Sequence, residues 1–227
     1  VRYSKQHCFD LMIWGLKLRL CNKNNLTEQR WITMPKFHDT IEREFIASRL
    51  KSGGVFLDIG ANAGFYTFWV LSKNFADVSI FTVEPSKILQ KRLLYNLRSN
   101  HLENKVTLLD CALTKEKRMV NIIESSTNLG ETKVAKSGNE NLVQGYSLQE
   151  IIESNSITNF RVLKIDIEGE EFEILSSFFR TAPKKTWPQT IVCELIGKDS
   201  ELLKSLLQIN NYKLVKRTKL NGIFNSK

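Results

Sequence analysis

Apolar residues along the chain alternate between short continuous runs and longer segments with helical spacing, starting near residue 54. Short apolar runs bounded by turn residues are typical of strands that are buried on both faces of a sheet. Five such runs predict strands, at residues 55–59, 78–83, 106–109, 161–167 and 190–195. The segments with helical spacing predict helices, at residues 65–73, 86–100, 170–179 and 199–209.

This alternation predicts an α/β fold with a doubly wound, mostly parallel sheet. Short connections and right-handed crossovers place helices on both faces of such a sheet. Two further segments, 212–217 and 222–225, predict an antiparallel hairpin at the C-terminal end. We therefore expect a seven-stranded, Rossmann-like sheet that closes with this hairpin.

Two regions interrupt the alternation. Residues 1–50 precede the first predicted strand and include helix-like stretches, such as residues 40–50. We expect an N-terminal helical extension that packs on the sheet edge or covers the site as a lid, with residues 51–227 as the main domain. Residues 114–145 are polar, and we expect a strand at 119–123 followed by a mobile loop at the rim of the site.

The length and the net charge of the chain limit the number of domains and the kinds of partner to be expected. The chain has 227 residues, which suits one α/β domain with a buried core. Its net charge of +9 fits an anionic partner such as nucleic acid, but also a lysine-rich, evenly solvated surface. Because the basic residues are spread along the chain without a long basic run, we expect the second alternative and no nucleic-acid partner.

The cysteines and the hydropathy of the chain indicate its cellular compartment and whether it spans a membrane. The chain has four cysteines, none in a CxxC pair or a Cys/His metal spacing: Cys8, Cys21, Cys111 and Cys193. We therefore expect free thiols in a reducing cytoplasm and no bound metal. The apolar segment 9–20 contains three charged residues and is shorter than the roughly 18 residues that a membrane span needs, so we expect no span.

A glycine-containing motif, Asp58-Ile-Gly60-Ala-Asn62-Ala-Gly64, follows the first predicted strand and precedes a helix. In this context Gly60 allows a sharp turn, Gly64 allows close packing, and the helix N-terminus offers free N–H groups to a ligand. The carboxylate of Asp58 would repel the pyrophosphate of a dinucleotide and attract an ammonium group. The motif therefore favours a methionine-type cofactor over NAD, and the alternative is a plain structural turn.

Acidic residues also end the next two predicted strands. Glu84 ends the second strand, where a carboxylate can accept hydrogen bonds from both hydroxyls of a ribose. Asp110 and Cys111 end the third strand, where Asp110 could accept from the exocyclic amine of an adenine and the next backbone N–H could face the ring edge. Glu84 and Asp110 could each also be a solvated loop acid.

The segment Leu163-Lys-Ile-Asp-Ile-Glu-Gly169 carries three charges in an otherwise apolar strand. Alternation places Lys164, Asp166 and Glu168 on one side, where charges are costly unless they are paired or functional. Glu194 ends the neighbouring strand, so we expect it near Asp166. Such carboxylates suit a general base, a clamp for substrate hydroxyls or a divalent cation, and Glu194 could instead pair with Lys164.

In this order, the motifs resemble the FkbM family of methyltransferases. The resemblance spans about residues 52–195 and lies in Phe56 to Gly64, Glu84-Pro85, Ala112-Leu113, Ser147-Leu148, Leu163 to Glu171 and Glu194. The family usually has Ser-Leu-Asp where this chain has Ser147-Leu148-Gln149, which leaves the role of Gln149 open. The resemblance implies a class I methyltransferase fold and S-adenosylmethionine as cofactor. The residues expected to bind it are Asp58, Gly60, Asn62, Gly64, Glu84, Asp110 and Cys111.

The resemblance further implies an O-methyltransferase that acts on a small-molecule or saccharide acceptor. Asp166, Glu168 and Glu194 would face this acceptor, and one of them would take the hydroxyl proton. One alternative is an RNA methyltransferase or a non-catalytic nucleic-acid-binding module, motivated by the charge of +9. An NAD-type oxidoreductase fits less well, because the loop lacks the GxGxxG pattern. His38 could reach the site if residues 1–50 form a lid, although a surface or core position is expected.

Overall fold

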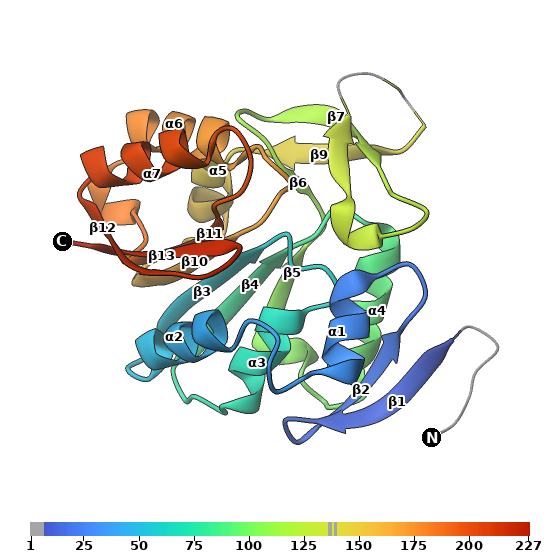
Figure 1. Cartoon of the computed structure of the whole chain (residues 1–227). Coiled ribbons are helices and arrows are strands. Elements are labelled where there is room, and N and C mark those ends of the chain that lie inside the picture. The colour runs from blue at the N-terminus through green and yellow to red at the C-terminus, as the bar shows by residue number, and fades with distance from the viewer. Residues whose placement is uncertain (1–6, 136–137, 139) are drawn as a thin grey trace.

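The computed structural model describes residues 7–135, 138 and 140–227. Its centre is a seven-stranded sheet in the order β12-β13-β11-β10-β3-β4-β5 (Figure 1). The parallel strands are β3 (Gly54–Ile59), β4 (Val78–Val83), β5 (Val106–Leu109), β10 (Phe160–Ile165) and β11 (Thr190–Glu194). At one edge β13 (Asn221–Ser226) runs antiparallel between β11 and β12 (Tyr212–Arg217). The predicted mostly parallel, seven-stranded sheet with a C-terminal hairpin is confirmed.

Helices cover both faces of this sheet (Figure 1). One layer contains α2 (Thr40–Leu50), α3 (Phe65–Ser72) and α4 (Lys87–Arg98). The opposite layer contains α5 (Leu148–Ser154), α6 (Glu171–Thr181) and α7 (Ser200–Ile209). Successive residues of a strand point to opposite faces, so Phe56 joins the core under the first layer and Leu57 the core under the second. Burial on both faces explains the continuous apolar runs of the central strands.

The N-terminal region differs from the expected helical extension. Residues 9–20 lie in a hairpin of β1 (Cys8–Ile13) and β2 (Leu16–Cys21), followed by α1 (Leu26–Thr33) and the expected α2. The turn residues Trp14 and Gly15 both have positive φ angles, +54° and +81°, which suit a two-residue hairpin turn. This hairpin was not predicted, because charged residues on the exposed side interrupt its two short strands.

A disulfide joins Cys8 and Cys21, which are partners in the hairpin register. The expectation of four free thiols is therefore wrong, since only Cys111 and Cys193 are free, and both are buried. The bond removes the sequence-based reason for expecting a reducing cytoplasm, because disulfides persist mainly in oxidising compartments. In the part of the chain that the structure describes, no helix is long and apolar enough to span a membrane.

Residues 112–146 form a small second sheet in the order β6-β9-β7-β8. Its strands are β6 (Ala112–Leu113), β9 (Leu142–Tyr146), the predicted β7 (Arg118–Ile123) and β8 (Lys133–Ala135). The expected loop is wrong where β8 and β9 occur, since these strands are short and lie in a polar segment. Residues 136, 137 and 139 of that expected loop lie outside the described residues.

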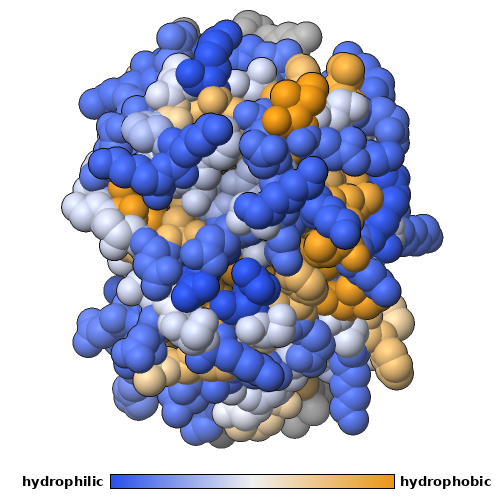
Figure 2. Space-filling view, turned by 90° about the vertical axis from the view of Figure 1, so that its left-hand side faces the viewer, coloured by the Kyte–Doolittle hydropathy of each residue, from blue (hydrophilic) through white to orange (hydrophobic). Residues whose placement is uncertain are grey.

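Three short 3-10 turns connect these elements: η1 (Glu103–Lys105), η2 (Leu129–Glu131) and η3 (Lys184–Thr186). Figure 2 shows one face of the molecule, on which hydrophilic residues predominate and apolar residues lie in small groups between them. On this face, the apolar residues gather mainly toward the right-hand side of the view.

Candidate active site

A cavity of about 310 Å³ lies where the central parallel strands end. Ligands of doubly wound sheets bind at this carboxyl edge, and volumes of roughly 300–1,000 Å³ are typical of small-molecule sites. Strand ends and the loops after them, residues 59–62, 83–85, 164–168 and 194, form what we call the floor of the cavity. The opposite side, which we call the cover, consists of residues 24–39 and 128–134, most of which line the cavity.

Glycine is required at both ends of the loop after β3. Gly60 has a φ of +68°, and a Cβ there would clash with the carbonyl oxygen of Asp166. Gly64 has a φ of +91° at the start of α3, and a Cβ would lie 2.9 Å from the Phe68 ring. The predicted sharp turn and close packing are confirmed. The close neighbour of Gly60 in this structure is the backbone after β10, which fixes the two halves of the floor against each other.

Glu84 follows the neighbouring strand, β4, and holds the loop after β3 in place. Its carboxylate accepts hydrogen bonds from the backbone N–H groups of Asn62 and Ser86, both at 2.8 Å. The side chain lines the cavity but is only 3% exposed, and burial raises its pKa to about 7. A carboxylate has about four lone-pair sites, so two accepted bonds leave capacity for hydroxyl donors. The predicted ribose contact is compatible with this geometry and stays a prediction.

Lys164 is a buried cation in the floor of the cavity. Its ammonium group donates to the carbonyl oxygens of Gly60 and Ile59 at 2.9 and 3.3 Å, and it lies 3.6 Å from Asp166 and 3.8 Å from Asp58. Burial lowers the pKa of Lys164, but the surrounding carboxylates, Asp166 and Asp58 foremost, together raise it above its usual value, so the side chain stays charged. The expected cost of a charge in this strand is thus offset by pairing, and the pairs involve Asp58 and Asp166, not Glu194.

Asp58 is placed differently from the expectation. It is fully buried, does not line the cavity, and accepts a hydrogen bond from Thr67 at 2.8 Å. Its other oxygen has no hydrogen-bond partner and faces Lys164 at 3.8 Å, while burial raises its pKa. In this geometry Asp58 acts on the cavity through Lys164, and direct contact with a ligand remains a prediction.

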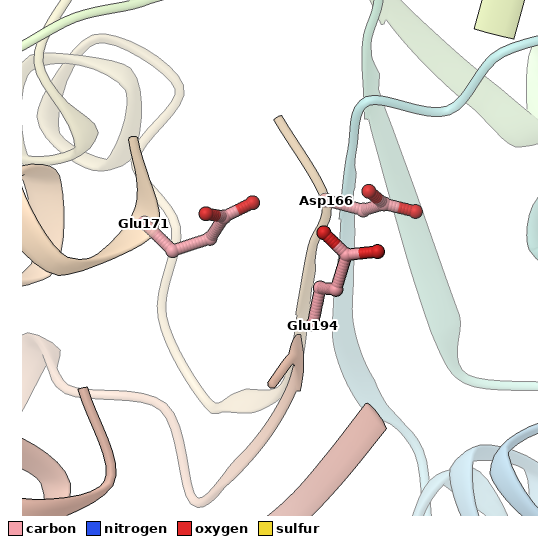
Figure 3. A group of neighbouring side chains, drawn as sticks. All are labelled: Asp166, Glu171 and Glu194. Atoms are coloured by element: carbon pink, nitrogen blue, oxygen red, sulfur yellow. The ribbon is translucent and has the colours of Figure 1, made fainter. Parts of the chain in front are cut away.

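Three carboxylates converge at the ends of β10 and β11 (Figure 3). Oxygens of Asp166, Glu171 and Glu194 lie within 4.8 Å of one another, the only such group of potential metal ligands among the described residues. The expected proximity of Asp166 and Glu194 is confirmed. Glu171 is occupied by the N–H groups of Ile167 and Gly169 at 2.8 and 3.1 Å, so it braces the loop before α6. The other two remain available to a ligand, and a cation would also find suitable donors here.

Glu168 lies in a turn and not on the strand. β10 ends at Ile165, and Glu168 and Gly169 have φ angles of +62° and +102°. The expectation that strand alternation carries through to Glu168 is therefore wrong, although Glu168 still lines the cavity beside Asp166. Burial and the neighbouring Asp166 raise the pKa values of Glu168 and Glu194 to about 7, and Lys133 opposes this at Glu168 from 3.8 Å.

Asp110 and Cys111 do not line the cavity. Asp110 is half exposed, accepts a hydrogen bond from Gln90 at 2.5 Å and pairs with Lys87. Cys111 belongs to the buried core, where burial raises its pKa to about 11. The next two residues, Ala112 and Leu113, do line the cavity. The adenine contact expected for this segment stays a prediction, and the geometry favours these apolar neighbours for it.

The cover is joined to the floor by hydrogen bonds between distant segments. Asn25 is buried, caps α1 by accepting from Glu28 N at 3.1 Å, and donates to Asn62 at 2.6 Å. Asn128 accepts from Leu26 N at 3.1 Å, and Leu129 N donates to the Asn24 carbonyl at 2.8 Å. The N-terminal region and the second sheet therefore meet above the glycine loop.

Three further residues line the cavity, two from the cover and one from α3, and none of them was predicted as a site residue. His38 and Asp39 line it from the loop before α2, and Tyr66 lines it from the first turn of α3. Tyr66 donates to Asp39 at 2.8 Å, and His38 Nδ1 lies 3.5 Å from Asp39. Tyr66 could have been found from its position just after the glycine loop, and His38 was considered only as part of a possible lid. Gln149, in contrast, lies on α5 and bonds Glu153, so the departure from the family pattern does not touch the cavity.

Comparisons with known proteins place this geometry in a family. The profile of the methyltransferase FkbM domain matches residues 58–214, more than half of the chain. A comparison with curated proteins finds no significant match. Among solved structures, the methyltransferase FkbM from Methylobacillus flagellatus KT has a TM-score of 0.51 at 17% identity. That alignment covers 76% of this chain and 43% of that chain, so this chain spans less than half of its length.

Two other solved methyltransferases have similar folds. The METTL16 methyltransferase domain has a TM-score of 0.56 at 17% identity, covering 94% of this chain and 74% of that chain. Human methyltransferase 10 domain containing protein has a TM-score of 0.50 at 15% identity, covering 94% of this chain and 90% of that chain. Identities this low establish the shared fold and leave the acceptor open.

The cofactor that the family implies is S-adenosylmethionine, and the floor fits it. A buried carboxylate with spare lone pairs lies beside a loop in which Gly60 has no room for a side chain, and both line the cavity. Both the family and the cavity therefore indicate S-adenosylmethionine as the methyl donor. The chain belongs to the FkbM family of methyltransferases.

Proposed function

We propose that the protein transfers the methyl group of S-adenosylmethionine to a hydroxyl group of a small polyhydroxylated acceptor, such as a saccharide. The observation that carries the proposal is the group of carboxylates beside the glycine loop in one cavity. Carboxylates accept hydrogen bonds from hydroxyls, and several at one place suit an acceptor that carries several hydroxyls.

The donor, when bound, supplies an activated methyl group on a sulfonium. Gly60, Asn62, Gly64 and Glu84 would hold it, with Asp58 acting through Lys164 and the segment after β5 next to the adenine. The work of the chain is then to align the acceptor for in-line attack and to exclude water. We propose that the N-terminal region, residues 1–50, takes part in this exclusion through its share of the cover, residues 24–39, with residues 51–227 as the cofactor-binding domain.

Asp166, Glu168 and Glu194 would orient the acceptor. The three carboxylates differ in ion pairing and in protonation. Asp166 is paired with Lys164, whereas Glu168 and Glu194 have pKa values of about 7. Near neutral pH the last two are partly protonated and can both donate and accept hydrogen bonds. A hydroxyl is also both donor and acceptor, so this mixture of states suits its recognition.

An RNA acceptor is the second class to consider, because of the net charge of +9. Phosphates bind basic surfaces, whereas the acceptor side of this cavity carries several acids. This acidic lining speaks for a neutral polyol and against a nucleic-acid backbone at the reacting end.

The proposal is tested by methyl transfer from labelled S-adenosylmethionine. Methyl glycosides, simple phenols and a short structured RNA serve as acceptor panel, and product NMR identifies the methylated atom. We expect O-methyl products from the hydroxyl compounds and none from the RNA. Methylation of RNA or of a nitrogen atom would contradict the proposal, as would the absence of any product with saturating donor.

A further inference from the structure

The loop before α2 presents a histidine–aspartate pair to the cavity. His38 Nδ1 lies 3.5 Å from Asp39, and the other oxygen of Asp39 accepts from Tyr66 Oη at 2.8 Å. All three residues line the same cavity as Asp166 and Glu194. A carboxylate next to one imidazole nitrogen orients the ring and leaves the other nitrogen, Nε2, for a substrate.

We propose that His38, oriented by Asp39, is the general base that takes the proton from the acceptor hydroxyl. This inference rests on the proposed O-methyl transfer and assigns its proton acceptor to the cover. The hydroxyl oxygen forms a bond to the methyl carbon, the carbon–sulfur bond breaks with its electron pair going to sulfur, and the proton moves to Nε2. The products are a methyl ether, S-adenosylhomocysteine and an imidazolium, which returns its proton to water.

The pair is held firmly, as a catalytic geometry requires. Arg43 is buried and donates to the backbone carbonyls of His38, Pro35 and Lys36 at 2.8–3.2 Å. Its guanidinium lies 4.3 Å from the ring centroid of Trp69 and 4.9 Å from that of Trp14. The His38 ring packs on Phe65 with centroids 4.5 Å apart. These contacts fix both the backbone and the ring of His38.

The carboxylates of the floor are less suited to the same step. Asp166 is paired with Lys164, Glu171 is held by two backbone N–H groups, and Glu168 faces Lys133. Glu194 has no such partner among the residues that the structure describes and is the strongest rival, so the test must separate it from His38. An imidazolium formed at His38 would be stabilised by the carboxylate of Asp39. The carboxylates of Asp166, Glu168 and Glu171, in contrast, are already held by the contacts named above.

The charges around His38 favour the neutral base. Burial lowers the pKa of His38, Asp39 and Glu42 raise it, and Arg30 and Arg43 lower it further, with a net lowering. The imidazole is therefore neutral near pH 7 and able to accept a proton. Activity should fall as the pH drops and His38 becomes protonated.

The first test needs no acceptor. The chain has three histidines, so NMR of ¹⁵N-histidine-labelled protein bound to S-adenosylhomocysteine resolves His38, with the H38N variant for assignment. We expect a neutral ring at pH 7 with its proton on Nδ1, and loss of this preference in D39N. A ring protonated on Nε2, or an imidazolium at pH 7, would overturn the inference whether or not an acceptor is found.

The second test uses the first panel compound that the parent protein methylates. H38N keeps a donor near Asp39 but lacks Nε2, so we expect kcat to fall by about 10²–10⁴-fold with little change in donor KM. The fall should be partly rescued by free imidazole in H38A. H101N, at an exposed histidine, is the matched control and should keep parental activity. E194Q should mainly raise the acceptor KM.

The outcomes separate the two proposals. If the parent protein methylates a hydroxyl and H38N does so at the same rate, His38 is not the base and the function stands. If E194Q loses kcat and H38N does not, the base is Glu194. If the parent protein methylates no hydroxyl, the proposed function fails, while the NMR result still decides the state of His38.

Discussion

The floor and the cover of the cavity are built in different ways. The floor consists of strand ends whose positions follow from parallel pairing, and its charged groups hold one another through Glu84, Lys164 and Asp166. The cover consists of a loop, a helix and a second sheet that meet through hydrogen bonds between residues some hundred positions apart. The positions of the floor residues thus follow from strand order and pairing, whereas those of the cover residues depend on contacts that strand order does not fix. This division suggests that the floor serves the common donor and the cover the particular acceptor.

Among the tests of this comparison, the largest effect is expected for a substitution at Gly60 in the floor. Gly60→Ala adds a Cβ that clashes with the Asp166 carbonyl, in a backbone conformation that favours glycine. We expect it to lower the free energy of unfolding by at least about 3 kcal/mol in urea denaturation. Gly169→Ala is the control, because φ is also positive but no atom lies within 4 Å, and about 1–2 kcal/mol is expected. Equal losses would mean that contact between the two loops does not hold the floor.

The buried carboxylate of Glu84 predicts a pH dependence of similar size. Its pKa is about 7 in the folded protein and near 4.5 otherwise, so the folded state favours the protonated acid. The resulting stability is fully present below about pH 4.5 and is lost as the pH rises through about 7, by about 3 kcal/mol. Chemical denaturation between pH 5 and 8 measures it, and E84Q should flatten this part of the curve. An unchanged slope in E84Q would show that Glu84 is ionised throughout.

A smaller effect is expected in the cover at Asn25. Asn25→Ala removes the cap of α1 and its hydrogen bond to Asn62, so we expect a loss of about 1–2 kcal/mol. Hydrogen exchange should increase in α1 more than in α6, because the link between cover and floor is broken. Asn22→Ala, at an exposed position of the same segment, should stay within about 0.5 kcal/mol of the parent. Equal exchange in α1 and α6 would mean that the cover and floor open as one unit.

The same division explains what the sequence could predict. Apolar runs located the central strands to within a few residues, and the glycine loop, Glu84 and the convergence of Asp166 with Glu194 follow from strand order alone. The hairpin, the disulfide between Cys8 and Cys21 and the approach of His38 to the cavity do not, since each depends on contacts that no local pattern encodes. Asp58 and Asp110 were placed at the correct strand ends, but which way their side chains turn depends on Lys164, Lys87 and Gln90.

The most direct test of the division is the affinity of S-adenosylhomocysteine, measured by isothermal titration calorimetry for the parent protein, E84Q and H38N. We expect E84Q to weaken binding by about 10–100-fold, because an amide has one acceptor oxygen where the carboxyl group has two, and both of these already hold the loop. H38N should stay within about two-fold of the parent, because we propose that His38 acts on the acceptor and not on the donor. A loss in H38N as large as that in E84Q would place His38 on the donor side and contradict the account.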